Sequence, residues 1–272
     1  METRPTEASS GDCRSRRRQN TWVVALAALI AVIFPEAGQA ASRCKAPQEL
    51  VRFKASLPRL AAAVRSRKEI KIVALGSSST AGAGASSKRA CYPSRLEAEL
   101  NQRYPDKQFA VLNLGVGGQL ASHMLARIAA DVLPRKPALV IWQTGVTDAI
   151  SDVGLTNFSN TLRRGTDELT SNGIDVILLD MQYYPRAEYM AGYRDYLNAM
   201  RGVGKEKNIP VLHRFDIMRY WVMSSQFSAD ELLAPDRFHV NDLTYGCLAD
   251  ILVDAIQDGL ARDSMTALPV YK

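Results

Sequence analysis

A turn of small residues, GSSST at positions 76–80, directly follows a short apolar run. Such a turn can expose a serine hydroxyl as a nucleophile and bring backbone amides close to a substrate oxygen. A serine-rich turn with nearby glycines also suits phosphate binding, but the chain lacks the GxxxxGK spacing of a P-loop and its lysine. Taken alone, the turn is compatible with a nucleophile, a phosphate loop or a plain flexible loop.

Two glycine-containing segments follow later apolar runs: positions 113–118 have the sequence NLGVGG, and positions 142–148 have WQTGVTD. Glycines at such places let the main chain approach a bound group, and their amides can form an oxyanion pocket. Each segment also has a structural explanation, because Gly115 and Gly118 can serve tight turns and Asp148 can cap the start of a helix. One such segment by itself decides nothing.

The fourth chemically suggestive segment is DRFH at positions 236–239. An ester hydrolase needs a base that takes the serine proton and a carboxylate that holds the imidazole in the right tautomer. Asp236 precedes His239 by three residues, so the carboxylate and the imidazole can meet within one turn of a loop. The other histidines, His123 and His213, lie near a predicted helix start and a predicted strand end, which favours structural or surface roles.

The elements that must position these segments alternate between short apolar runs and longer amphipathic ones. Strands are predicted at positions 70–75, 109–114, 138–143, 175–179 and 210–212. Helices are predicted at positions 48–66, 92–104, 122–133, 157–172, 188–208 and 243–262, and an irregular stretch at 223–241. The alternation predicts an α/β fold with a central parallel sheet of about five strands and helices on both faces, in three α/β/α layers. The ligand site of such sheets lies beyond the carboxyl ends of the strands, where the suggestive residues fall.

The order of these segments resembles the sequence blocks of the SGNH (GDSL-type) hydrolase family. The blocks are Gly-x-Ser after the first strand, Asn-x-Gly-x-x-Gly after the second, Gly-x-x-Asp after the third and Asp-x-x-His before the last helix. They span nearly all of the chain after residue 40. The resemblance implies a flavodoxin-like fold and a metal-independent serine esterase, lipase, thioesterase or carbohydrate deacetylase, with no cofactor.

By motif match, the resemblance implies that Ser78 is the nucleophile and that Asp236 and His239 complete the triad. It also implies an oxyanion hole made by the amide of Ser78, the amide of Gly118 and the residue at position 147. Two positions depart from the family pattern. The usual aspartate before the nucleophile is replaced by Ser77, and Thr147 stands where an asparagine usually supplies an oxyanion donor. Losing such a donor costs about 10² to 10³ in rate.

Residues 1–40 are predicted to be an export signal, and residues 41–272 one SGNH hydrolase-like domain. A basic region at 14–18 precedes an uncharged apolar run at 22–34, which is shorter than the about 20 apolar residues of a spanning helix. Small residues around Ala40 offer a cleavage site, and an uncleaved membrane anchor is the alternative. The protein is expected to be exported, periplasmic or extracellular, and to contact a membrane only through this segment.

Charge and cysteine content favour some classes over others. The formal net charge is +6, but basic residues are scattered after residue 40, so nucleic acid is not expected as a partner. No Cys or His spacing resembles a zinc site, and no metal is expected. Beyond the signal, Cys44, Cys91 and Cys247 permit three different single bridges. We expect Cys44 to pair with Cys247, which would stabilise the fold by about 4 to 5 kcal/mol.

The predicted function is ester hydrolysis through an acyl-enzyme. His239 deprotonates Ser78, the acyl group moves to Ser78, and water activated by His239 releases it. Because export is expected, the substrate is predicted to be an O-acylated glycan, a lipid or a small ester. Two alternatives stay open: an O-acyltransferase with the same triad, and a non-catalytic carbohydrate- or lipid-binding relative, which Thr147 favours.

Overall fold

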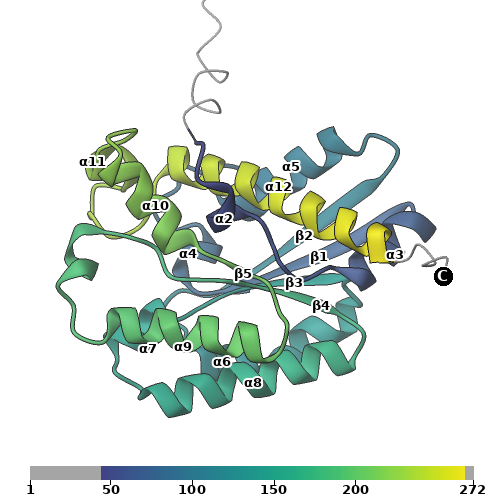
Figure 1. Ribbon diagram of the computed structural model, residues 1–272, viewed down its shortest axis with the longest axis horizontal. Helices are drawn as coiled ribbons and strands as arrows, with labels where there is room; N and C mark the ends of the chain where they lie inside the picture. The colour runs from purple at the N-terminus through teal and green to yellow at the C-terminus, as the bar shows by residue number, and fades with distance from the viewer. Residues whose placement is uncertain (1–43, 267–272) are drawn as a thin grey trace, which may run out of the picture. The chain divides into compact units, whose positions relative to one another are not determined.

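The apolar runs of the sequence form five parallel strands in one sheet (Figure 1). They are β1 (Glu69–Gly76), β2 (Gln108–Gly115), β3 (Leu139–Gln143), β4 (Asp175–Leu179) and β5 (Val211–Leu212). Strands β3 and β4 are buried along their whole length, as inner strands of a sheet covered on both faces must be. The predicted α/β class and the number of strands are confirmed.

The structure is a computed structural model that describes residues 44–266, with side chains described for residues 44–263. The predicted export signal at residues 1–40 lies outside this range. Within it, no helix combines the length and the apolar character needed to cross a membrane.

The strands follow the order β2-β1-β3-β4-β5, which is the doubly wound order of flavodoxin-like folds. Strand β1 pairs with β2 from Glu69–Gln108 to Gly76–Gly115, and with β3 on its other side. The direction of winding therefore reverses between β1 and β3. Loops that leave the carboxyl ends of these two strands diverge there and leave room for a ligand site.

Helices cover both faces of the sheet (Figure 1). One layer contains α3 (Pro58–Ser66), α5 (Tyr92–Arg103) and α12 (Asp242–Thr266), and the other contains α6 (Ala121–Ala126), α8 (Leu155–Ser171) and α9 (Tyr193–Glu206). Helix α12 packs along α5, and α8 packs against both α6 and α9. The predicted three-layer α/β/α arrangement is confirmed.

Three helix predictions were too long. The predicted helix at 48–66 is two helices, α2 (Gln48–Val51) and α3, because Pro58 can start a helix but would break one that ran through it. The predicted helix at 188–208 begins only at Tyr193, after a 3₁₀ turn over Pro185–Glu188. The helix predicted at 122–133 continues beyond α6 as a π-helical turn, Ile128–Val132, and not as regular α-helix.

Among the helices that were not predicted are α10 (Arg214–Met223) and α11 (Ala229–Leu232), the second of them inside the stretch expected to be irregular. The start of α10 is capped from a distance, because Oδ1 of Asp180 accepts a hydrogen bond from the Phe215 amide at 2.9 Å. A cap supplied by the loop after β4 leaves no local signal before α10, so its start could not be read from the neighbouring sequence.

A disulfide joins Cys44 to Cys247 across a sequence separation of 203, as predicted. It ties the segment before α2 to α12. Cys91 is buried and carries a free thiol.

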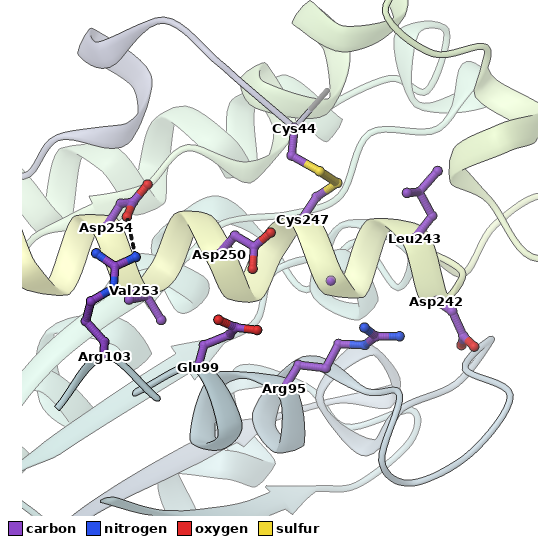
Figure 2. Close-up of a pocket in the computed structure, with 11 residues that line it drawn as sticks. Cys44, Arg95, Glu99, Arg103, Asp242, Leu243, Cys247, Asp250, Val253 and Asp254 are labelled. Atoms are coloured by element: carbon purple, nitrogen blue, oxygen red, sulfur yellow. Dashed lines mark ion pairs between the residues drawn. A yellow bond between two sulfur atoms is a disulfide. The ribbon is translucent and has the colours of Figure 1, made fainter. Parts of the chain in front are cut away.

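A groove between α5 and α12 lies beside this disulfide (Figure 2). Glu99 of α5 and Asp250 and Asp254 of α12 bring three carboxylates to the groove, and Arg103 approaches Asp254 at 3.7 Å. Burial, and then the carboxylates of Glu99 and Asp254, raise the pKa of Asp250 to about 6, while two nearby arginines act to lower it. The groove contains none of the predicted catalytic residues.

At neutral and higher pH, replacing Asp250 by asparagine is expected to raise the Tm. The folded-state pKa of about 6 lies above the value of about 3.9 for an unfolded aspartate. The contribution of Asp250 to stability is therefore fully present below about pH 4 and is lost as the pH rises through about 6. Asp250→Asn removes this loss, so the Tm difference between variant and wild type should grow between about pH 4 and about pH 8.

Asp258→Asn is the matched control for this measurement, because Asp258 lies on the same helix but pairs with Arg262 at 3.1 Å. Because this control removes an ion pair, it should not be more stable than the wild type. A Tm difference for Asp250→Asn that does not change with pH would contradict the prediction.

Candidate active site

Ser78 is the first residue of α4 (Ser78–Ala81), a single helical turn directly after β1. This turn packs so tightly that glycine is required around it. A Cβ atom on Gly76 would lie 2.1 Å from Oγ1 of Thr80, and one on Gly115 would lie 2.1 Å from the nitrogen of Ala81. As the first helical residue, Ser78 has a backbone N–H that cannot bond within its helix. Its amide as an oxyanion donor stays a prediction.

The structure brings Ser78, His239 and Asp236 together, although 161 residues separate the serine from the histidine. Nε2 of His239 lies 3.0 Å from Oγ of Ser78, and its Nδ1 lies 2.6 Å from Oδ2 of Asp236. These are hydrogen-bonding distances in the arrangement of a nucleophile, a base and an orienting acid. The Asp236 side chain is 49% exposed and that of His239 20%, so this site opens to solvent.

Asp236 also shapes the loop that carries the histidine. Its Oδ1 accepts hydrogen bonds from the amides of Phe238 at 3.0 Å and His239 at 2.9 Å. Desolvation acts to raise the pKa of Asp236, but the hydrogen bonds from the His239 ring and from these two amides together lower the pKa below its usual value. The carboxylate is therefore ionised at neutral pH, as an acid that holds an imidazole N–H must be.

The second block holds the loop after β2 against the nucleophile turn. Nδ2 of Asn113 donates to the carbonyl oxygen of Thr80 at 2.8 Å. A Cβ atom on Gly117 would lie 4.0 Å from Cβ of Ser78, whereas one on Gly118 would meet nothing within 4 Å. Gly118 has a φ of 74°, a left-handed conformation that favours glycine, and it borders open space. Its amide as an oxyanion donor stays a prediction.

Asp148, in the third block, does more than cap a helix. Its carboxylate accepts the amide of Gly145 at 3.3 Å at the start of α7 (Val146–Ile150), and the hydroxyl of Thr144 at 3.2 Å. It also accepts the amide of Ala121, at the start of α6, at 3.0 Å. Asp148 therefore ties the loop after β3 to the segment after β2, and its burial raises its pKa against these hydrogen bonds.

Thr147 lies beside Asp148 in α7 and is half-buried. We predict that its hydroxyl donates a hydrogen bond to the oxyanion but reaches less far than an asparagine amide would, because the threonine side chain is shorter. Thr147→Asn should then raise kcat on a simple acetyl ester, by at most the about 10² to 10³-fold that one donor contributes. Thr147→Val, which cannot donate, should lower kcat.

Measuring kcat and Tm for both variants distinguishes this from a packing role for Thr147. If the threonine only packs or caps the helix, asparagine should leave kcat unchanged and valine should lower the Tm. An unchanged kcat in both variants would remove Thr147 from the oxyanion hole.

Two buried glutamines beneath the site were missed from the sequence, Gln143 and Gln182. Oε1 of Gln143 accepts from both the amide and the hydroxyl of Ser77 at 3.2 Å, and from the hydroxyl of Thr80 at 3.1 Å. Ser77, which replaces the usual aspartate, therefore donates its hydrogen bonds to Gln143 and makes none with His239 among the described contacts. Each glutamine comes at or just after the end of a buried strand, and a polar residue at that place is the signal that was available.

The other histidines lie in structural contacts, as predicted. Nδ1 of His123 accepts the amide of Leu120 at 3.3 Å at the start of α6, and His213 lies 3.7 Å from Asp216. Among the side chains described for residues 44–263, no three His, Cys, Asp or Glu groups gather as metal ligands.

A model of the Non-GDSL lipase-like family matches residues 43–262. No curated protein matches the chain in sequence. Among solved structures, a two-domain esterase active on acetylated mannans is 20% identical with a TM-score of 0.66, over 81% of this chain and 58% of that protein. This chain therefore spans little more than half the length of that esterase.

Two other solved structures are matched over nearly their full length. An acetyl xylan esterase is 21% identical with a TM-score of 0.59, over 69% of this chain and 100% of that one. A lipase/acylhydrolase from Enterococcus faecalis is 23% identical with a TM-score of 0.56, over 71% of this chain and 96% of that one. At these identities the likeness concerns the fold.

Proposed function

Because the chain belongs to the Non-GDSL lipase-like family, and with it to the SGNH-type carboxylic-ester hydrolases, we propose that it cleaves esters through an acyl-enzyme on Ser78. The family predicted from the four sequence blocks is confirmed by this membership. The observation that supports the proposed chemistry best is the pair of contacts made by His239, at 3.0 Å to Ser78 and 2.6 Å to Asp236.

In the proposed first step, Oγ of Ser78 attacks the carbonyl carbon of the ester while Nε2 of His239 takes the hydroxyl proton. The negative charge that develops on the carbonyl oxygen is stabilised by the amides of Ser78 and Gly118 and by the hydroxyl of Thr147. The bond to the alcohol then breaks, and the histidine gives its proton to the leaving oxygen. Asp236 holds Nδ1–H throughout and stabilises the imidazolium.

In the second step, water takes the place of the alcohol. His239 removes a proton from the water as its oxygen attacks the acyl carbon, and the bond to Ser78 breaks with return of that proton to the serine oxygen. The products are a carboxylic acid and the free enzyme. An alcohol in place of water would give acyl transfer, so the same residues could serve an O-acyltransferase.

The proposed substrate is an O-acylated glycan, with acetyl as the first acyl group to test. The two-domain esterase acts on acetylated mannans, and another relative in fold is an acetyl xylan esterase. The half-exposed side chain of Asp236 leaves this side of the site open to a bulky alcohol. Lipids and small esters are the other substrates to compare. The proposal also includes export by a signal at residues 1–40, one domain at 41–272, and a periplasmic or extracellular location.

The test is to assay the protein with p-nitrophenyl acetate, butyrate and octanoate and with acetylated xylan and mannan, and to label it with a fluorophosphonate probe. Turnover of the acetate ester together with release of acetate from a glycan supports the proposal. Labelling without turnover points to acyl transfer. If the protein shows no labelling and no turnover, the proposal is contradicted and a binding protein is favoured.

A further inference from the structure

A single buried side chain connects the two segments that carry the candidate nucleophile and base. Gln182, in the loop after β4, is 1% exposed. Its Oε1 accepts a hydrogen bond from Oγ of Ser79 at 2.9 Å, and its Nε2 donates to the carbonyl oxygen of Phe238 at 3.1 Å. Ser79 directly follows Ser78, and Phe238 directly precedes His239. The Gln182 amide therefore bridges the nucleophile turn and the histidine loop.

Arg214, the first residue of α10, determines which way this amide faces. Nη2 of Arg214 donates to Oε1 of Gln182 at 3.2 Å, and Nε donates to the carbonyl oxygen of Asp180 at 3.0 Å. A guanidinium only donates hydrogen bonds, so the amide atom beside it must be the oxygen. The nitrogen of the Gln182 amide must then face Phe238. The hydroxyl of Tyr193 donates to the backbone oxygen of Gln182 at 2.8 Å and holds the main chain as well.

The burial of Arg214 makes the free energy of folding less favourable. It is 2% exposed, its described hydrogen bonds go to neutral oxygens, and its Nη1 has no hydrogen-bond partner in the part of the chain that the structure describes. Burying a guanidinium in this way disfavours folding, and an apolar side chain of similar volume often serves stability as well or better. The charge of Asp180 offsets part of this cost. The hydrogen bond from Arg214 to Gln182 points to a role beyond stability.

We propose that Gln182, oriented by Arg214, is a positioning residue that sets the contact between Ser78 and His239. This inference rests on the ester hydrolysis proposed above. Without the bridge, the histidine loop keeps the bonds of Asp236 and the 2.8 Å bond from the Ala234 amide to the His239 carbonyl. It loses the hydrogen bond from Gln182 to Phe238, and the contact of His239 with Ser78 then lacks this support. Proton transfer is sensitive to such displacements, and misplacement by about 1 Å can cost about 10²-fold in rate.

Gln182→Glu is the sharpest variant for testing this bridge. A carboxylate keeps an acceptor for Ser79 and gains an ion pair with Arg214, but it cannot donate to the Phe238 carbonyl. We expect kcat on p-nitrophenyl acetate to fall by about 10 to 10²-fold with KM nearly unchanged. A slower rate of fluorophosphonate labelling should accompany the fall in kcat.

Gln257→Glu is the matched control, because Gln257 lies on α12 and its Oε1 also accepts from an arginine, Arg103, at 2.6 Å. This control should leave kcat unchanged. Gln182→Met, which replaces the three side-chain hydrogen bonds of Gln182 by apolar volume, repeats the test if the carboxylate lowers the Tm. Arg214→Lys should lower kcat less than Arg214→Met, because a lysine can still donate to Oε1 of Gln182.

The outcomes separate this inference from the proposed function. Turnover by the wild type with an equal kcat in folded Gln182→Glu and Gln182→Met overturns the inference and leaves the esterase proposal standing. If the wild type has no turnover, the esterase proposal fails, and the NMR signals of the His239 ring then test the positioning role of Gln182. Ring signals that are the same in Gln182→Glu and the wild type overturn this role. Ring signals that change in Gln182→Glu but not in Gln257→Glu support it.

Discussion

Ser78→Ala and His239→Ala are each expected to reduce ester turnover to near background, by about 10⁴ to 10⁶-fold, with little change in Tm. The first variant removes the oxygen that forms the acyl-enzyme, and the second removes the only group within 3.0 Å of that oxygen that can take its proton among the contacts described for residues 44–263. Folding survives because Ser78 lies on a single turn and His239 on a loop open to solvent.

Asp236→Asn should also impair turnover, by at most as much as the other two substitutions. An asparagine can still accept the amides of Phe238 and His239 through its oxygen, so the loop is expected to keep its shape. Its amide nitrogen cannot accept Nδ1–H, so the imidazole would be held in the wrong tautomer or not held at all.

The measurement is kcat/KM on p-nitrophenyl acetate beside fluorophosphonate labelling, with Ser87→Ala and His213→Ala as controls. Ser87 is an exposed serine beyond the nucleophile turn, and His213 lies near Asp216. Both controls should keep wild-type activity, and labelling should disappear in Ser78→Ala. Wild-type turnover in Ser78→Ala or His239→Ala would exclude the proposed site.

Loss of the Cys44–Cys247 disulfide is expected to have the largest effect on stability. The bond closes a loop with a sequence separation of 203, and constraining a loop of that length in the unfolded chain is worth about 5 kcal/mol. For a domain of this size, each kcal/mol corresponds to about 2 to 4 °C in Tm. Cys247→Ala, or reduction of the wild type, should therefore lower the Tm by about 10 to 20 °C.

Cys91→Ala is the control, because Cys91 is buried but carries no disulfide. Its Tm should fall on reduction by as much as that of the wild type, whereas the Tm of Cys247→Ala should not respond to reductant. Peptide mapping of the unreduced protein should recover the Cys44–Cys247 crosslink. A crosslink that contains Cys91 would contradict both the mapping and the stability prediction.

The strands could be placed from the sequence because each one leaves a local signature. A strand buried on both faces of a parallel sheet is mostly apolar, as the run at positions 139–142 of β3 shows. Glycine and small residues at the carboxyl ends of β1 and β2 were equally visible, and the structure explains them by the close approach of the chain at Gly76 and Gly115. Helix boundaries were less accurate where the deciding group was distant, as with Asp180 at the start of α10.

The three cysteines after residue 40 permitted three bridges, and the structure has the expected one, Cys44–Cys247. The sequence by itself determined the family, the α/β/α class and the candidate residues Ser78, Asp236 and His239. These depend on residue types at short spacings, such as the three residues that let Asp236 reach the imidazole. Only the tertiary structure placed His239 at 3.0 Å from a serine 161 residues away.

The tertiary structure alone also showed how Gln182 and Arg214 connect the nucleophile turn to the histidine loop. Their hydrogen bonds join α4, the loop after β4, α10 and the loop before α12, segments that meet only when the sheet and its helices pack. No pattern along the chain encodes which buried amide will lie between two loops, because that contact depends on the summed packing of every element that separates them.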